Sequence, residues 1–375
     1  MSLHPAEQAE PSRRPTKAVR VVVVDDSAIV RKLLVDGLNG EPGIEVVGTA
    51  ADPFQARDVI VRLEPDVITL DIEMPRMDGL SFLRKLMEHR PMPVIIISSL
   101  TQRGSATAIE ALRAGAIDVI PKPGGPYSIG EITETLRRKI LGIRESAPRP
   151  TKAHDVTKSP AVSFDHVRPG HGLIAIGAST GGPQAIEALL TRLPKGCPPI
   201  VIAQHMPEHF TRTYADRLDK VCPMRVVEAT DRQAVESGVA YIAPGDRHML
   251  IERDGVRLVV RLTDTPAVHH QRPSVDVMFH SVAKLRAVKV VALLLTGMGQ
   301  DGADGLVDLR HQGAETIAEH EQSCVVYGMP REAIARGGAG HVASLLRMPS
   351  LIADCFTKLQ SAKPKRAGSN ARLGH

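Results

Sequence analysis

The sequence predicts two α/β domains, each built on a doubly wound parallel sheet. Three observations predict this fold class. The chain has 375 residues, which is too long for one ordinary core. Short apolar runs typical of β-strands alternate with helical patterns in both halves. Between the halves lies a segment rich in Pro, Ser, Thr and charge, which is typical of an exposed linker.

The expected organisation is a solvated tail (1–17), a first domain (18–145), a linker (146–170), a second domain (171–358) and a basic tail (359–375). The first tail lacks the apolar core of a secretory signal, and no apolar run approaches the roughly 20 residues that a membrane helix needs. We therefore expect a cytoplasmic protein without membrane insertion.

Composition excludes several classes of protein. Hydrophobic residues make up 43% and charged residues 24% of the chain, so a fibrous or mainly disordered protein does not fit. The four cysteines have no CxxC spacing, which argues against zinc, iron–sulfur or disulfide frameworks. The net charge is only +5, aromatic residues are 3% and Trp is absent, so we expect no nucleic-acid partner.

Five apolar runs predict the strands of the first domain. They are VRVVVV from Val19, IEVVGTA from Ile44, DVITL from Asp66, PVIIIS from Pro93 and DVIP from Asp118. Helical patterns such as Ile29–Leu38 and Ala106–Ala114 separate them. This alternation predicts βαβ units whose helices cover both faces of a parallel sheet.

Polar residues follow these runs, at the edge where parallel sheets bind ligands. They are Asp25, Asp26, Asp71, Ser98, Ser99 and Lys122. Clustered carboxylates repel one another unless a cation lies between them, and a set of oxygen ligands suits Mg²⁺. A lysine and a hydroxyl nearby could then hold phosphoryl oxygens. Any single acid here is more simply interpreted as a helix cap, but the joint occurrence favours a site.

The segments VVDDS, TLDIEMPRMDG, ISS and PKP together resemble the response-regulator receiver family, over residues 19–144. The resemblance implies a flavodoxin-like receiver fold in which Asp71 is phosphorylated. It also implies Mg²⁺ binding by Asp26, Asp71 and the Glu73 carbonyl, with Asp25 supporting the metal site.

The same resemblance implies roles for residues after the last two runs. Ser98 takes the position of the switch hydroxyl and Lys122 that of the receiver lysine, with the Lys122–Pro123 bond expected to be cis. Val119 departs from the family pattern, because many receivers have an aromatic switch residue there. We therefore expect a different packing between the pocket and the output surface.

Five further runs predict the strands of the second domain. They are LIAIG from Leu173, PIVIAQ from Pro199, MRVVEA from Met224, GVAYIAP from Gly238 and VVALLLTG from Val290. Helices are expected at Pro183–Arg192, Glu208–Leu218 and Ala303–Gln312. The pattern again predicts a parallel sheet covered by helices.

The first of these runs leads into Gly177-Ala178-Ser179-Thr180-Gly181, a G-x-S-x-G motif between a strand and a helix. This is the context of a nucleophile elbow. Ser179 is the candidate nucleophile, and the Thr180 amide at the helix N-terminus is a candidate donor to an oxyanion. The alternative is a Gly-rich turn whose serine only caps the helix.

Two other runs end in residues that could serve this serine. His205 follows PIVIAQ and Asp301 follows VVALLLT. The carboxyl ends of parallel strands share one edge, so Ser179, His205 and Asp301 form a candidate set of nucleophile, base and orienting acid. Their chain order differs from the Ser, Asp, His order of α/β-hydrolases, so the ordinary hydrolase fold is not the best match.

A rival hypothesis is a dinucleotide-binding module. Gly297-x-Gly299-x-x-Gly302 follows a strand, and Glu319 follows it at a suitable distance. Against it, Asp301 at the helix start would repel a pyrophosphate. The hypothesis also leaves the serine and histidine unexplained.

GASTGG, QHMP, APGDRHM and GMGQDGADG closely resemble the C-terminal domain of the chemotaxis protein-glutamate methylesterase (CheB) family. The resemblance implies that Ser179 is the nucleophile, His205 the general base and Asp301 its orienting acid. It implies an oxyanion hole made by the backbone amides of Thr180 and Met298.

With the receiver in front, the resemblance covers roughly residues 19–358. It implies hydrolysis of γ-glutamyl methyl esters on chemoreceptors with release of methanol, and in many members deamidation of receptor glutamines. It implies chemoreceptors as substrates, a chemotaxis histidine kinase as phosphodonor, Mg²⁺ for phosphorylation, and no cofactor for the ester hydrolysis. We expect a monomer whose receiver covers the Ser179 edge until it is phosphorylated. The alternative is a receiver-regulated binding protein with a catalytically silent hydrolase-like domain.

Overall fold

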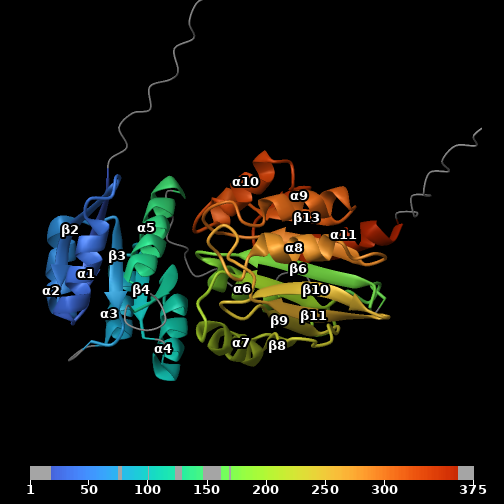
Figure 1. Cartoon of the computed structure of the whole chain (residues 1–375), viewed down its shortest axis with the longest axis horizontal. Coiled ribbons are helices and arrows are strands. Elements are labelled where there is room, and N and C mark those ends of the chain that lie inside the picture. The colour runs from blue at the N-terminus through green and yellow to red at the C-terminus, as the bar shows by residue number, and fades with distance from the viewer. Residues whose placement is uncertain are drawn as a thin grey trace, which may run out of the picture.

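The computed structural model describes residues 18–74, 78–99, 101–122, 129–146, 162–168 and 170–361. Both predicted tails lie largely outside these residues, as do most of the predicted linker and Pro123. Figure 1 shows two α/β units side by side, the first in blue to teal and the second in green to red. Among the helices of the described residues, none is long and apolar enough to cross a membrane.

The first unit contains a parallel sheet of five strands in the order β2-β1-β3-β4-β5. The strands are β1 Val19–Val24, β2 Ile44–Ala50, β3 Val67–Asp71, β4 Val94–Ser98 and β5 Asp118–Pro121. The helices are α1 Ala28–Leu38, α2 Pro53–Leu63, α3 Gly79–His89, α4 Gln102–Arg113 and α5 Ile129–Ser146. All five predicted strands are present. Short polar side chains cap the first four helices by accepting backbone N–H groups.

The second unit contains a parallel sheet of seven strands in the order β14-β13-β12-β6-β7-β9-β8. The strands are β6 Gly172–Ala178, β7 Ile200–Gln204, β8 Arg225–Glu228, β9 Val239–Ile242, β12 Lys289–Leu294, β13 Glu315–Glu319 and β14 His341–Ala343. The helices are α6 Gly182–Leu190, α7 Phe210–Val221, α8 Val275–Ala283, α9 Ala303–His311, α10 Met329–Ala335 and α11 Met348–Ser361, with a 3₁₀ turn at Glu321–Ser323. The five predicted strands form, and β13 and β14 extend the sheet beyond them.

Two apolar layers cover this sheet. Helices α6, α7 and α11 pack on one face. Helices α8, α9 and α10 pack on the other, together with an antiparallel hairpin of β10 His248–Asp254 and β11 Arg257–Thr263. The hairpin was not among the predicted elements. Its apolar stretches are short and bounded by charged or polar residues, unlike the continuous apolar runs of the central strands.

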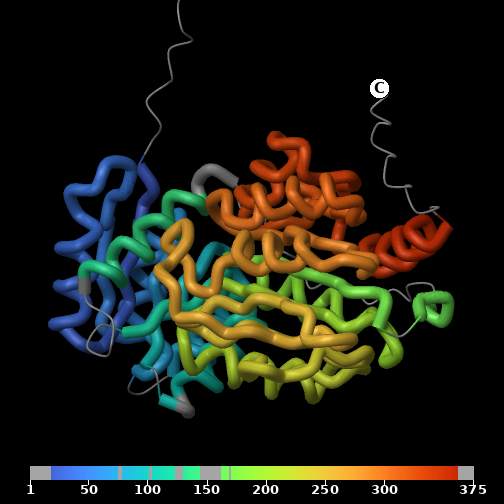
Figure 2. The backbone as a smooth tube through the Cα atoms, turned by 45° about the vertical axis from the view of Figure 1, so that its right-hand side comes forward, coloured from blue at the N-terminus to red at the C-terminus, as the bar shows by residue number. Residues whose placement is uncertain are grey.

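The two units contact each other through α4, β5 and α5 of the first. Helix α4 packs on α6 and α7. The apolar side of α5 shares a core with Val325 and Val326 of the second unit. Figures 1 and 2 both place α5 directly against that unit. This contact brings the first unit to the edge of the second sheet that carries Ser179.

Each sheet has a topological switch point, where the connections from two neighbouring strands lead to opposite sides of the sheet. In the first sheet this point lies between β1 and β3, and in the second between β6 and β12. Ligands of open α/β sheets bind at such points, beyond the carboxyl ends of the strands. Of the predicted residues, Asp25, Asp26 and Asp71 lie at the ends of β1 and β3. Ser179 and Asp301 follow β6 and β12, and His205 follows the neighbouring β7.

Candidate functional site

Ser179 lies in a sharp turn between β6 and α6. The turn is closed by a hydrogen bond from the Gly182 amide to the Ser179 carbonyl at 2.7 Å. Gly181 has φ 78°, a left-handed conformation that favours glycine. The Ser179 side chain is therefore presented at the carboxyl edge of the sheet, as expected for a nucleophile elbow.

His205 and Asp301 form a buried pair at the same edge. His205 Nε2 lies 2.7 Å from Asp301 Oδ2. The other ring nitrogen, Nδ1, is buried and has no hydrogen-bond partner among the described residues. Within that part of the chain, no hydrogen bond joins the Ser179 hydroxyl to the ring. The free Nδ1 is thus the nitrogen that remains available to accept a proton.

Asp301 is held by four donors. Besides His205, it accepts hydrogen bonds from Ser274 Oγ at 2.8 Å, Val275 N at 2.8 Å and Asp276 N at 3.0 Å. Burial by itself would raise the pKa of Asp301, but the bond and charge of His205 and the two amides hold it below its usual value. The amides belong to the N-terminus of α8, which favours a negative charge. The carboxylate therefore stays charged beside the histidine.

Ser274 was not among the predicted site residues. It caps α8, accepting a hydrogen bond from Val277 N, and its own hydroxyl reaches Asp301. Its amide in turn donates to His248 Nδ1 at 3.1 Å, within the APGDRHM segment. Only the folding of α8 against the loop after β12 brings these groups together, so no local pattern could have revealed them.

Gln204 links the candidate nucleophile and base. Its side-chain Nε2 donates to the Ser179 carbonyl at 2.9 Å and to the His205 carbonyl at 3.1 Å. The His205 amide also donates to the Ala178 carbonyl at 3.1 Å. These bonds fix the ends of β6 and β7 relative to each other.

The loop that starts at Thr296 lies against Ser179. The Ser179 amide donates to the Thr296 carbonyl at 3.0 Å. A Cβ at Gly297 would lie 2.8 Å from the Ser179 Cβ, so only glycine permits this approach. The backbone amides of Thr180 and Met298 donate to no acceptor within the described residues. Two free amides near a serine are what an oxyanion hole requires.

The first unit covers this edge. Thr180 Oγ1 donates to Asp118 Oδ2 of β5 at 2.6 Å, and the Gly181 amide donates to the Ile117 carbonyl at 3.0 Å. Gly142 of α5 packs so closely on the Met298 side chain that a larger residue would collide with it. The residues that flank Ser179 are therefore engaged by the first unit.

The second predicted site lies at the carboxyl ends of β1 and β3. Asp71 is buried, and its Oδ2 pairs with Lys122 Nζ at 2.6 Å while its Oδ1 accepts the Glu73 amide at 2.9 Å. Burial raises the pKa of Asp71 to about 6, although Lys122 and the Glu73 amide oppose this. Burial also raises the pKa of Asp25.

The acids of this pocket fit a divalent cation. Carboxylate oxygens of Asp25, Asp26 and Asp71 lie within 4.8 Å of one another. Asp25 Oδ2 is buried and has no hydrogen-bond partner among the described residues. An orphaned buried carboxylate oxygen beside two other acids is the donor set that Mg²⁺ prefers.

Other predicted residues of this pocket have different surroundings. Ser98 is buried, and its hydroxyl donates to the Gly104 carbonyl at 3.1 Å rather than to Asp71. The neighbouring Ser99 donates to Glu73 Oε1 at 3.1 Å. Val119 is buried in the core of the first unit. Because the residue is a valine, this position has no aromatic ring that could move between the pocket and the surface.

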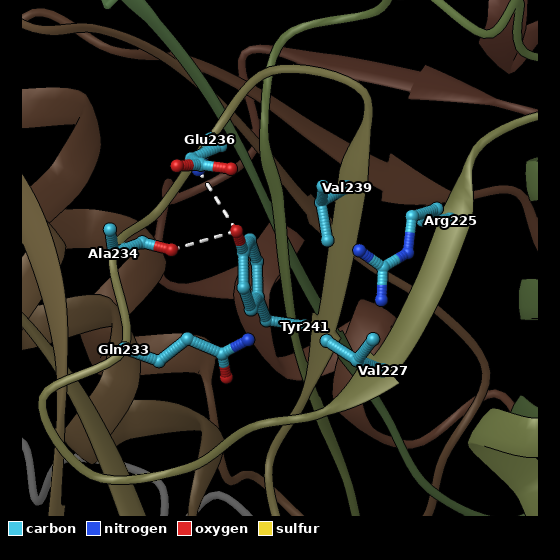
Figure 3. Close-up of a pocket in the computed structure, with 7 residues that line it drawn as sticks. All are labelled: Arg225, Val227, Gln233, Ala234, Glu236, Val239 and Tyr241. Carbon is cyan, nitrogen blue, oxygen red and sulfur yellow. Dashed lines mark hydrogen bonds between the residues drawn. The ribbon is translucent and has the colours of Figure 1, made fainter.

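A small cavity lies elsewhere in the second unit, at the amino ends of β8 and β9 (Figure 3). Arg225 and Gln233 point toward it, and Tyr241 OH donates to the Ala234 carbonyl beside it (Figure 3). In a parallel sheet this is the end opposite the carboxyl edge that carries Ser179. None of the predicted site residues lines it.

Comparison with known proteins places these features in a family. The CheB methylesterase family model matches residues 174–352, and the response regulator receiver domain model matches residues 21–134. The chain is 51% identical to a protein-glutamate methylesterase/protein-glutamine glutaminase of Anaeromyxobacter dehalogenans, over 87% of this chain and 92% of the relative. The chain belongs to the CheB methylesterase family. The receiver resemblance and the CheB resemblance drawn from the sequence motifs are thereby confirmed.

The chain is also similar to another curated relative and to a solved structure. The protein-glutamate methylesterase/protein-glutamine glutaminase of Escherichia coli is 48% identical, over 87% of this chain and 94% of the relative. The crystal structure of the Thermotoga maritima CheB methylesterase catalytic domain shares 37% identity and a TM-score of 0.48, covering 48% of this chain and 97% of that one. The CheB methylesterase family model includes residues 297–302, so this motif belongs to the methylesterase domain and not to a dinucleotide-binding module.

Proposed function

We propose that this CheB protein hydrolyses γ-glutamyl methyl esters on chemoreceptors, with Ser179 as nucleophile, His205 as general base and Asp301 as the acid that orients His205. The observation that carries the proposal is the buried His205–Asp301 pair, whose Nδ1 has no hydrogen-bond partner in the described parts of the chain. This pair lies at the same sheet edge as Ser179 and the Thr180 and Met298 amides, which donate to no acceptor among the same residues. A catalytically silent binding domain would have no need of a charged carboxylate with four donors.

The reaction follows the double-displacement course of serine esterases. Ser179 Oγ attacks the ester carbonyl while its proton passes to His205 Nδ1, and the Thr180 and Met298 amides stabilise the oxyanion. The C–O bond to the methoxy group breaks, and His205 returns the proton to release methanol. Water then attacks the acyl-enzyme with His205 again as base, which frees Ser179 and the receptor glutamate. A glutamine side chain would react in the same way and release ammonia.

Replacing the nucleophile tests the site directly. Ser179→Ala should lower kcat by a factor on the order of 10⁶, because a triad without its nucleophile retains only binding and oxyanion stabilisation. The readout is methanol release from methylated receptor membranes, with circular dichroism as the control for folding. His205→Ala should behave similarly. Methanol release by Ser179→Ala near the wild-type rate would contradict the assignment.

The receiver supplies regulation. We assign phosphorylation to Asp71, with a chemotaxis histidine kinase as phosphodonor and with Ser98 and Lys122 as contacts of the phosphoryl oxygens. Asp25, Asp26, Asp71 and the Glu73 carbonyl would hold Mg²⁺, which neutralises charge during phosphoryl transfer. Lys122 already bonds Asp71, so a phosphoryl group there would replace an existing ion pair.

The unphosphorylated receiver inhibits by covering the catalytic edge. The contacts of Thr180 with Asp118, of Gly181 with Ile117 and of Met298 with α5 leave little room for a helical substrate. A free-energy change of a few kcal/mol is enough to shift the equilibrium between the covered and uncovered arrangements. Phosphorylation supplies this change by repacking the receiver.

A residue remote from the chemistry tests this inhibition. Gln184 of α6 donates to the Leu112 carbonyl at 2.7 Å and to the Ala116 carbonyl at 2.5 Å of the receiver. Gln184→Ala should raise the phosphodonor-free rate several-fold and leave the phosphodonor-stimulated rate unchanged, because it weakens only the covered state. Gln233→Ala, beside the distant cavity, is the matched control. A lower phosphodonor-free rate for Gln184→Ala would mean that the receiver organises the active site instead of blocking it.

A further inference from the structure

Glu319 is a buried carboxyl group that the proposed reaction does not use. It is the last residue of β13 and is 0% exposed. Its Oε2 accepts a hydrogen bond from the Thr296 amide at 2.7 Å, whereas its Oε1 has no partner in the described parts of the chain. Burial raises the pKa of Glu319 to about 7, against the opposing effects of the Thr296 amide and of the nearby Ser323 and Cys324 side chains. Burying such a group is costly, which indicates that this position needs an acceptor.

Thr296 joins Glu319 to the nucleophile elbow. Its carbonyl accepts the Ser179 amide at 3.0 Å. Its hydroxyl donates to the Thr180 carbonyl at 3.0 Å, with the Val326 carbonyl at 3.2 Å as a second, longer acceptor for the same proton. One residue thus holds the backbone on both sides of the Ser179–Thr180 peptide. Glu319 holds the same residue from behind, through its amide.

The other bonds of Thr296 do not replace this support. The amides of Val325 and Val326 donate to the Thr296 hydroxyl at 3.1 and 3.0 Å. The amides of Val325 and Val326 restrain the Thr296 side chain, whereas Glu319 provides the acceptor for the Thr296 main-chain amide. Without an acceptor at Glu319, the buried Thr296 N–H would be left unpaired, and the loop would have to shift to satisfy it.

We propose that Glu319 is a positioning residue for the ester hydrolysis, which acts by fixing Thr296 and, through Thr296, the backbone of Ser179 and Thr180. This inference rests on the roles of Ser179 and Thr180 in the proposed function. A displacement of about 1 Å at a reacting group costs about 10²-fold in rate. The loss should fall on kcat, because Glu319 is fully buried and therefore cannot contact a receptor helix directly.

Two variants separate the acceptor from the charge. Glu319→Gln keeps a carbonyl oxygen for the Thr296 amide and removes the ionisable group, so kcat should stay within about threefold of wild type. Glu319→Met has a similar length and no comparable acceptor, so kcat should fall by about 10- to 100-fold with KM within about twofold. The full-length protein is assayed for methanol release from methylated receptor membranes, with saturating acetyl phosphate and Mg²⁺.

A matched control separates positioning from general loss of stability. Thr316 lies on the same strand, is buried, and donates its hydroxyl to the Gly338 carbonyl at 2.6 Å, away from the elbow. Thr316→Val should lower Tm while kcat stays near wild type. All variants are compared at a temperature well below their Tm. Glu319→Asp, whose carboxylate is one methylene too short to reach Thr296, should show the same kcat loss and serves if the Met variant does not fold.

The outcomes distinguish this inference from the proposed function. A wild-type kcat in Glu319→Met or Glu319→Asp, with Ser179→Ala inactive, would overturn the role of Glu319 and leave the nucleophile in place. An equal loss in Glu319→Gln and Glu319→Met would overturn the acceptor mechanism. Activity in Ser179→Ala would overturn the proposed function itself. A further test is Thr296→Val combined with Glu319→Met, which should cost less than the product of the two single losses if both act on one element.

Discussion

The two strand-end sites of this protein treat their carboxylates in opposite ways. In the receiver, Asp71 and Asp25 have raised pKa values because burial outweighs their partners. Asp25 Oδ2 lies 4.0 Å from Lys122 Nζ and accepts no hydrogen bond from the described residues. In the catalytic domain, Asp301 is equally buried but has four donors and a lowered pKa.

This difference in carboxylate pKa fits the roles proposed for the two sites. A pocket that receives a cation and a phosphoryl group needs oxygen atoms with free coordination sites, and burial of these oxygens, with a smaller effect of the neighbouring acids, raises their pKa. A carboxylate that orients an imidazolium must stay charged throughout the reaction, so its oxygens are fully satisfied by protein donors. Both sites occupy the same position in the same kind of sheet, and only the local donors distinguish them.

In this comparison, the largest effect on kcat should come from removing the charge of Asp301, the carboxylate that has four donors. Asp301→Asn should lower kcat by about 10⁴, because an amide presents an N–H to His205 and favours the wrong tautomer. Methanol release and substrate KM are the measurements. A loss of less than tenfold would show that the four donors serve the fold of α8 and not the histidine.

A smaller effect should come from removing one donor and keeping the charge. Ser274→Ala deletes the hydroxyl that donates to Asp301 Oδ1 and leaves the two amides and His205 in place. A hydrogen bond to a charged group contributes about 1.5–3 kcal/mol, so kcat should fall by about 10- to 100-fold. The loss should shrink in an Asp301→Asn background. Equal losses in both backgrounds would show that Ser274 acts by capping α8.

The smallest effect on the basal rate should come from the receiver carboxylate. Asp71→Asn should abolish stimulation by acetyl phosphate and change the basal rate by less than about twofold, because Asp71 touches no catalytic residue. EDTA should remove stimulation from the wild-type protein and leave the basal rate of both proteins unchanged, since the proposed serine mechanism uses no metal. Stimulation that survives in Asp71→Asn with Mg²⁺ present would place the phosphorylation site elsewhere.

Much of this architecture could be predicted from local patterns. The central strands are buried on both faces and therefore appear as continuous apolar runs, which made them predictable. All ten predicted strands are present, including the more exposed edge strands β2 and β8. The hairpin β10–β11 and the strands β13 and β14 were missed because polar or charged residues interrupt or bound their short apolar stretches, although β13 is largely buried. Residues that follow central strands could be assigned to one edge of the sheet. Both the candidate triad and the acidic pocket could therefore be predicted from the sequence.

The sequence by itself determined which residues end the strands, and the family to which their motifs belong. Parallel strands bring their carboxyl ends to one edge whatever the loops do, so Ser179, His205 and Asp301 had to lie on the same side. Only the tertiary structure decided what surrounds them. Ser274, Asp118 and Glu319 reach the site from elements distant in the chain, and hydrogen bonds between such elements depend on packing that no local pattern encodes.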